Sequence, residues 1–256
     1  MRLGICVPFE NLDAAAAYGY DYLEVTVGSI AGLSDEAFEV VKAAAAKKPI
    51  CVEAANVMLP GWGHVLGENT NWPEIMEYLT KAYSRLAQLG CKTVVFGSGG
   101  ARRIPEGFPR EKAWLQLAEF SKRIADLAAS VGITIALEPL NTKECNIITS
   151  VAEGGRLVEE VAHPHFKLLA DYYHMLKENE GFDGLLQYGK YLYHTHFHPA
   201  FGSEAAPNEG DGLEYKLFFD KLKEVSYDGR VSLEGTPNFG PAYEEACRYL
   251  KSMMGI

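Results

Sequence analysis

Short apolar runs alternate with helix-like segments along the whole chain, and this alternation limits the possible folds more than any other feature of the sequence. The runs predict β-strands at residues 3–7, 22–27, 50–57, 93–96, 133–138, 166–170, 191–197 and 230–233. The segments that follow them predict helices at residues 11–18, 34–47, 72–90, 110–131, 150–161, 182–190, 213–225 and 241–253. Ser34, for example, precedes the second helical segment and can cap it.

This order of elements predicts a closed barrel. A strand, helix, strand order gives right-handed crossovers and a parallel sheet. The chain has 256 residues and shows eight such alternations with no linker, low-complexity segment or domain break. These features favour an α/β fold of one domain, the (β/α)8 TIM barrel, over residues 1–256. A dinucleotide-binding sheet has no support, because no GxGxxG motif opens a helix after the first strand.

The stretch ITIALEPLN, residues 133–141, indicates where the chemistry of such a barrel would lie. Its apolar start is typical of a strand that is buried on both faces. Pro139 cannot donate a hydrogen bond to a neighbouring strand, so the strand ends there. Glu138 is therefore expected at the carboxyl end of a buried strand, the end of a TIM barrel that carries the active site. The alternative is a Glu side chain that simply faces water.

The next three predicted strands also end in, or carry, potential metal ligands. Four successive strands supply Glu138, then Asp171, then His194, His196 or His198, and finally Glu234. The three histidines alternate along one strand and share a face, so at most one or two of them can be ligands. Asp171 has an alternative role as the N-cap of a following helix. A set of mostly oxygen donors predicts one divalent ion, Mn²⁺ first, with Co²⁺, Mg²⁺ or Zn²⁺ as alternatives.

Charge and composition exclude several classes of partner. The net charge of −10 argues against nucleic acid, whose phosphates need a basic surface. The first residues, MRLGICVPFE, lack the apolar stretch of a signal peptide, and no run is long enough to span a bilayer. The five cysteines are widely spaced and include no CxxC pair, so neither a disulfide framework nor a thiolate zinc site is expected. We therefore expect a cytoplasmic protein that binds neither nucleic acid nor membrane.

Five motifs together resemble the xylose isomerase-like barrels, which comprise sugar phosphate isomerases/epimerases, ketose 3-epimerases, inosose dehydratases and type-two AP endonucleases. In chain order these motifs are VVFGSGGARRIPEGF, LEPLN, DYYHM, HTH and SLEG. The resemblance covers nearly the whole chain. It implies that one divalent ion is bound by Glu138, Asp171, His196 and Glu234, and that His194 lies lower in the barrel as a packing or supporting residue. It also implies a homo-oligomer, because relatives are often dimers or tetramers.

The ketose 3-epimerases have the most similar functional pattern. Their metal-binding Glu is followed six residues later by a sugar-binding Glu, which corresponds to Glu144 here. Their Asp ligand is followed three residues later by a substrate-binding His, which corresponds to His174. The chain departs from the pattern at Gly202, where those enzymes carry an Arg. The AP endonucleases fit less well, because their additional early His ligands are absent and the charge does not suit DNA.

These residues suggest a proton-transfer mechanism. The C–H group beside the carbonyl of an α-hydroxyketone is weakly acidic, and a divalent ion that bridges its oxygens stabilises the enediolate. Glu138 and Glu234, on the fifth and eighth strands, would face each other as the acid/base pair, and His174 would orient the substrate. We expect a metal-dependent isomerase or epimerase that acts on a small sugar or polyol. The alternatives are an inosose dehydratase-like lyase and a sugar-binding barrel without activity.

Two further groups of residues have less specific patterns. Glu24 and Glu53 lie on early strands, and each would either reach the pocket or serve as a buried ion pair or a rim carboxylate. Trp62 and His64 occupy a long loop that could cover the sugar, with a packing or oligomer contact as the alternative for Trp62.

Arg102 and Arg103 follow the glycine loop at residues 97–100. They would either bind a phosphate group of the substrate or form a salt bridge near the barrel rim, and the second alternative is slightly favoured.

Overall fold

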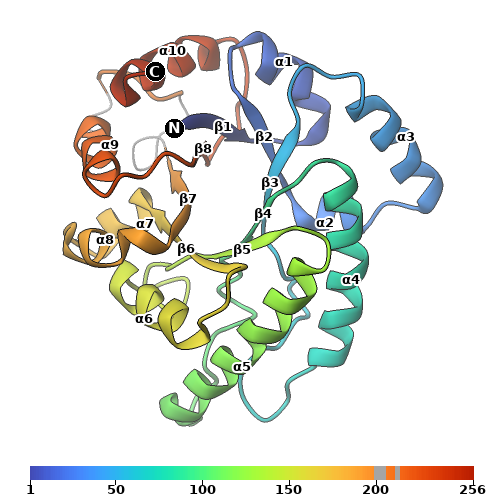
Figure 1. Ribbon diagram of the computed structural model, residues 1–256, viewed down its shortest axis with the longest axis vertical. Coiled ribbons are helices and arrows are strands. Elements are labelled where there is room, and N and C mark those ends of the chain that lie inside the picture. The colour runs from blue at the N-terminus through green and yellow to red at the C-terminus, as the bar shows by residue number, and fades with distance from the viewer. Residues whose placement is uncertain (199–205, 211–213) are drawn as a thin grey trace.

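The computed structural model describes residues 1–198, 206–210 and 214–256, and it confirms the predicted barrel. Eight parallel strands form a closed barrel in chain order, and helices surround it (Figure 1). The strands are β1 (Arg2–Cys6), β2 (Tyr22–Thr26), β3 (Val52–Asn56), β4 (Thr93–Phe96), β5 (Thr134–Leu137), β6 (Phe166–Asp171), β7 (Leu192–Phe197) and β8 (Arg230–Leu233). The α-helices are α1 (Leu12–Ala17), α2 (Val27–Ala31), α3 (Asp35–Ala45), α4 (Trp72–Gln88), α5 (Arg110–Ala129), α6 (Val151–Val161), α7 (Tyr172–Lys177), α8 (Asp183–Tyr188), α9 (Tyr215–Glu224) and α10 (Ala242–Met254).

The helices agree with the predicted segments in most places and differ from them in a few. The Ser34 side chain accepts a hydrogen bond from the backbone N–H of Ala37, which confirms the predicted cap of α3. The short helices α2 and α7 were not predicted, because five or six residues are too few to show a helical period. The predicted helix at residues 182–190 divides into α8 and a 3-10 turn, η2 (Gly189–Tyr191). The predicted helix at residues 213–225 corresponds to α9, and its predicted start at Leu213 lies outside the described residues.

Side chains fill the inside of the barrel below the carboxyl ends of the strands. Val95, Ala136 and Leu169, on three neighbouring strands, form a fully buried cluster of their own. The ring of Tyr22 is also fully buried and occupies the space next to Gly4, where an added Cβ would lie only 2.2 Å from that ring. The barrel is therefore a packed core, and a ligand can enter only at the ends of the strands.

The four predicted metal ligands lie at the carboxyl end of the barrel, and backbone hydrogen bonds hold two of them there. The N–H of Glu138 donates to the carbonyl of Phe96 at 3.2 Å, and the N–H of Glu234 donates to the carbonyl of Phe197 at 2.8 Å. Both carboxylates are thus held one residue beyond their strands. Asp171 and His196 are register neighbours on β6 and β7. In the part of the chain that the structure describes, no helix combines the length and apolar character needed to cross a membrane.

Candidate active site

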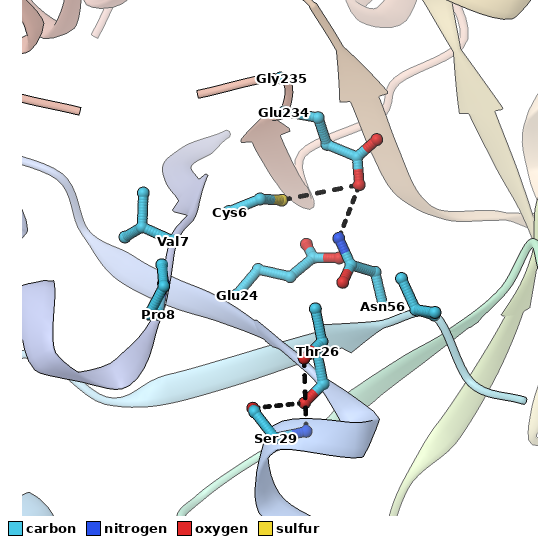
Figure 2. A pocket seen from close by; sticks show the side chains of 10 residues that line it. Cys6, Val7, Pro8, Glu24, Thr26, Ser29, Asn56, Glu234 and Gly235 are labelled. Atoms are coloured by element: carbon cyan, nitrogen blue, oxygen red, sulfur yellow. Dashed lines mark hydrogen bonds between the residues drawn. The ribbon is translucent and has the colours of Figure 1, made fainter. Parts of the chain in front are cut away.

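A pocket of about 310 Å³ opens at the carboxyl ends of the strands (Figure 2). It is lined by residues at the ends of β1, β2, β3 and β8, namely Cys6, Val7, Pro8, Glu24, Thr26, Ser29, Asn56, Val57, Glu234 and Gly235. The Asn56 amide donates to Oε1 of Glu234 at 2.7 Å, and the Cys6 thiol lies 3.7 Å from the same oxygen. The sequence analysis missed Cys6 and Asn56, although each is the last residue of its strand and therefore belongs to this rim.

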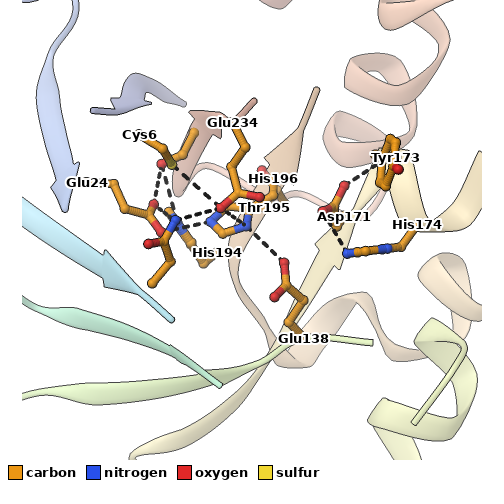
Figure 3. Close-up of polar contacts among 12 residues, drawn as sticks. Cys6, Glu24, Glu138, Asp171, Tyr173, His174, His194, Thr195, His196 and Glu234 are labelled. Carbon is orange, nitrogen blue, oxygen red and sulfur yellow. Dashed lines mark hydrogen bonds and ion pairs between the residues drawn. The ribbon is translucent and has the colours of Figure 1, made fainter. Parts of the chain in front are cut away.

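The four predicted metal ligands meet beside this pocket (Figure 3). The four residues are Glu138, Asp171, His196 and Glu234. Each offers one potential ligand atom, and these four atoms all lie within 4.8 Å of one another. Nδ1 of His196 lies 3.0 Å from Oε1 of Glu138 and 3.2 Å from Oε1 of Glu234. The carboxylates of β5 and β8 therefore face the same imidazole nitrogen.

Asp171 caps a helix and also faces the cluster, so its position agrees with both roles that the sequence left open. Its Oδ1 accepts a hydrogen bond from the backbone N–H of Tyr173 at 2.7 Å and caps helix α7. Its Oδ2 is buried, has no hydrogen-bond partner among the described residues, and lies 3.6 Å from Nε2 of His174. An unpartnered buried carboxylate oxygen is costly unless a cation or donor meets it. The cap thus uses one oxygen, and the other faces the cluster.

The cluster fits a divalent cation. Three carboxylates and one imidazole supply the hard oxygen donors and the single nitrogen that Mn²⁺, Mg²⁺, Co²⁺ and Zn²⁺ accept in proteins. The buried Oδ2 of Asp171 provides a ligand atom that has no hydrogen-bond partner among the described residues. The donor set therefore agrees with the predicted metal centre, and the identity of the ion stays a prediction.

Glu24 lies directly behind His196, inside the barrel. Its Oε1 is 3.0 Å from Nε2 of His196, and its Oε2 is 2.7 Å from Nε2 of His194. The hydroxyl of Ser232 donates to the same Oε2 at 2.6 Å. Because the Glu24 carboxylate accepts a hydrogen bond from Nε2 of His196, Nδ1 is the ring nitrogen that faces Glu138 and Glu234. Both the pocket contact and the ion pair left open for Glu24 are observed, because it lines the pocket and its buried carboxylate pairs with His194 and His196. His194 is itself fully buried, and its supporting role stays a prediction.

The pKa values of the cluster follow from burial and from mutual contacts. Burial raises the pKa of Glu138, and the contact with His196 offsets this effect only in part. Burial acts in the same direction on Glu234, but His196 and His198 outweigh it and lower the pKa of Glu234 to about 2. Burial alone would lower the pKa of His196, yet Glu234 and Glu24 raise it well above its usual value. Carboxylates thus surround the His196 ring, so this point of the barrel stabilises positive charge.

We expect Glu24→Gln to weaken metal binding. The substitution removes the negative charge behind His196 while keeping the size of the side chain. Loss of such an outer partner costs about 10–100-fold in metal affinity or activity. Titration of the protein with Mn²⁺ by calorimetry measures the effect, with Glu36→Gln on exposed α3 as the matched control. Equal Mn²⁺ affinity in wild type and Glu24→Gln would show that Glu24 does not support the site.

The two predicted sugar-binding residues His174 and Glu144 are linked through Asn141. The Asn141 side-chain amide donates to Oε1 of Glu144 at 2.7 Å and lies 2.9 Å from Nδ1 of His174. The backbone N–H of Asn141 also points to that Nδ1, at 3.2 Å. With two donors at Nδ1, the ring carries its proton on Nε2, the nitrogen that faces Asp171. Asn141 lies inside the LEPLN motif, but its type alone gave no sign of this role.

Trp62 and His64 lie apart from this cluster. Trp62 is 47% exposed and packs edge-on against Tyr78 of α4, with ring centroids 5.9 Å apart. His64 lines a different cavity of about 520 Å³, together with Pro105 and Phe108. Their contact with a substrate stays a prediction, and Gly202, where an Arg was expected, lies outside the described residues.

The loop that carries Trp62 and His64 is anchored to the loop after β4. The N–H of Val65 donates to the carbonyl of Ala101, and the N–H of Leu59 donates to the Ser98 hydroxyl. Both hydrogen bonds measure 2.9 Å, so the two loops are connected along their length.

The remaining candidates have structural contacts. Arg102 is fully buried and donates to the backbone carbonyl of Glu138, while Arg103 donates to the carbonyl of Lys143 at 2.9 Å. Among the described residues neither arginine forms the expected salt bridge, and both donate to backbone carbonyls instead. Glu53 pairs with Arg2 and Arg230 at the opposite end of the barrel, which confirms the ion-pair alternative for that residue.

The fold and this cluster define a class, a (β/α)8 barrel with a candidate metal centre of carboxylates and histidine at the carboxyl ends of its strands. The chain belongs to the xylose isomerase-like TIM barrel family, whose model matches residues 12–253. This match confirms the resemblance that the five motifs indicated.

Several proteins to which the chain is similar are sugar epimerases. The chain is 25% identical over 236 residues to a D-psicose 3-epimerase of Agrobacterium fabrum, covering 87% of this chain and 77% of that protein. It is 28% identical over 225 residues to the 3-dehydro-D-guloside 4-epimerase of Escherichia coli, covering 84% of each. A crystal structure of a D-psicose 3-epimerase in the presence of D-fructose matches the whole of both chains with a TM-score of 0.85 and 20% identity.

Proposed function

We propose that this protein is a divalent metal-dependent sugar epimerase or isomerase that moves the proton beside a carbonyl group. The observation that carries the proposal is the convergence of the Glu138 and Glu234 carboxylates on one imidazole, from β5 and β8, next to an open pocket. The relatives, which are epimerases of D-psicose, L-ribulose and 3-dehydro-D-guloside, support the same class of reaction.

Each residue of the cluster has a proposed role. The cation would be held by Glu138, Asp171, His196 and Glu234. When bound, a divalent ion supplies positive charge that polarises the carbonyl and hydroxyl oxygens of an α-hydroxyketone. One of the two glutamates removes the proton from carbon and the other returns a proton, either on the opposite face or at the neighbouring carbon. His174 and Glu144 would bind hydroxyl groups of the substrate, and Trp62 and His64 would lie nearer its far end.

The finer assignments rest on the donor set and on the sequence. We propose Mn²⁺ as the ion, because the donors are mostly carboxylate oxygens. The proposed substrate is a small sugar or polyol, and the protein is proposed to act in the cytoplasm as a homo-oligomer. The acidic net charge of −10 supports the absence of a nucleic acid partner.

Product analysis by NMR tests the proposal. The Mn²⁺-loaded protein is incubated with a panel of free ketoses, 3-keto-glycosides and inososes, and new sugar resonances are assigned. We expect an epimer or an aldose from at least one ketose, and no conversion in the presence of a chelator. An absorbing enone in place of an epimer would indicate a dehydratase. Binding of Mn²⁺ without conversion of any panel member would favour a sugar-binding role.

A further inference from the structure

His198 is the third of the alternating histidines His194, His196 and His198, and the proposed mechanism gives it no role so far. It follows β7 directly, and its Nε2 lies 3.1 Å from Oε2 of Glu234. That oxygen is distinct from Oε1 of Glu234, which faces Nδ1 of His196 and accepts from Asn56. His198 therefore contacts the oxygen of Glu234 that is not directed to His196 and Asn56.

The His198 ring is held on several sides. Its plane stacks on the ring of Tyr173, with centroids 4.4 Å apart and an angle of 27° between the rings. On another side, a Cβ added to Gly235 would lie 2.7 Å from Nδ1, so only glycine leaves room for the imidazole there. The hydroxyl of Tyr215 donates to the backbone carbonyl of His198 at 3.2 Å. The ring is about a quarter exposed and thus reaches the mouth of the barrel.

The two glutamates of the proposed acid/base pair are held differently. Asn56 and His198 fix one oxygen each of Glu234. Glu138 contacts His196 through Oε1, and its Oε2 lies against Gly97, where an added Cβ would come within 2.1 Å. Position 97 therefore shapes the space for Glu138, whereas side-chain donors orient Glu234.

We propose that His198 is a positioning residue that orients Oε2 of Glu234 for proton transfer on one face of the substrate. The proposal rests on the proposed function, because it assigns His198 to one of two opposing acid/base groups. With Oε1 directed to His196 and Asn56, Oε2 is the oxygen that can take a proton from carbon or return one. Loss of His198 would then disturb Glu234 and leave Glu138 in place.

The proposal predicts an asymmetric defect in His198→Ala. For the epimer whose C–H bond faces Glu138, exchange of that proton with solvent continues while conversion to the other epimer falls at least tenfold. For the opposite epimer, both exchange and conversion fall together, because Glu234 performs the first step. NMR in D₂O measures exchange and conversion separately for each epimer. His198→Gln keeps an N–H donor and should recover part of the loss. His163→Ala is the control and should match wild type, because His163 precedes the start of β6, at the end of that strand opposite to Asp171.

Three results would overturn the role of His198. These are an equal loss of exchange for both epimers, a rise in KM with unchanged kcat, and a crystal structure of His198→Ala in which Oε2 of Glu234 keeps its position. The crystal structure does not depend on turnover, so it tests the contact between His198 and Glu234 even if the wild-type protein exchanges no proton in any ketose. An absence of exchange in the wild type would reject the proposed function and would leave the contact between His198 and Glu234 to be decided by the crystal structure. Thermal unfolding of each variant identifies a loss of activity that comes from misfolding.

Discussion

Replacing Glu138 or Glu234 with glutamine should lower kcat by about 10²–10⁴-fold, the contribution typical of a positioned acid or base. A glutamine side chain has nearly the same shape, but it can neither take a proton from carbon nor return one. Both residues lie just beyond the ends of strands that stay packed, so the fold should persist. Steady-state kinetics with the accepted substrate, together with circular dichroism, separate loss of chemistry from loss of structure.

Glu119→Gln on the outer helix α5 is a suitable control, because it removes a carboxylate of the same type far from the site. Metal binding must be measured in the two active-site variants as well, since both glutamates are proposed ligands. Near-normal turnover in both variants, with Mn²⁺ bound, would remove Glu138 and Glu234 from the mechanism.

Asp171→Asn should abolish turnover while keeping the helix cap. Asparagine and aspartate cap helices about equally well, so Tyr173 N–H would keep its partner at the start of α7. The neutral amide is a much weaker ligand than a carboxylate, so Mn²⁺ affinity and activity should both fall strongly. Chelation of the wild-type protein should likewise remove turnover, and added Mn²⁺ should restore it.

Comparison with Asp171→Ala separates the two roles of the residue. Alanine removes both the ligand and the cap, and loss of a cap costs about 0.5–2 kcal/mol of stability. Chemical unfolding without added metal should therefore show Asp171→Ala less stable than Asp171→Asn. Full activity of Asp171→Asn, or full activity of the wild type in chelator, would contradict a catalytic metal ion at this site.

The sequence predicted the barrel and the cluster because both depend on local signals at the ends of strands. An apolar run that stops at Pro139 places Glu138 at a strand end, whichever residues it later meets. The repetition of that signal on four successive strands placed the four ligands on one rim, since parallel strands all end on the same side.

Contacts between distant parts of the chain could not be predicted in the same way. Glu24 meets His194 across 170 positions of sequence, and Asn56 meets Glu234 across 178. A carboxylate in the middle of a buried strand looks the same in the sequence whether it supports a metal ligand or pairs with an arginine, as Glu53 does. The stacking of His198 on Tyr173 likewise depends on how β7 and α7 pack, which no local pattern encodes.

The most direct test of the proposed chemistry is deuterium incorporation. The Mn²⁺-loaded protein is incubated in D₂O with the ketose that it converts, and recovered substrate and product are analysed by NMR and mass spectrometry. The account predicts one deuterium on the carbon beside the carbonyl in the product, because the returning proton comes through a glutamate that exchanges with solvent. Conversion without deuterium at that carbon would contradict the proposed two-base transfer, in which the returned proton comes from a different glutamate than the one that removed it.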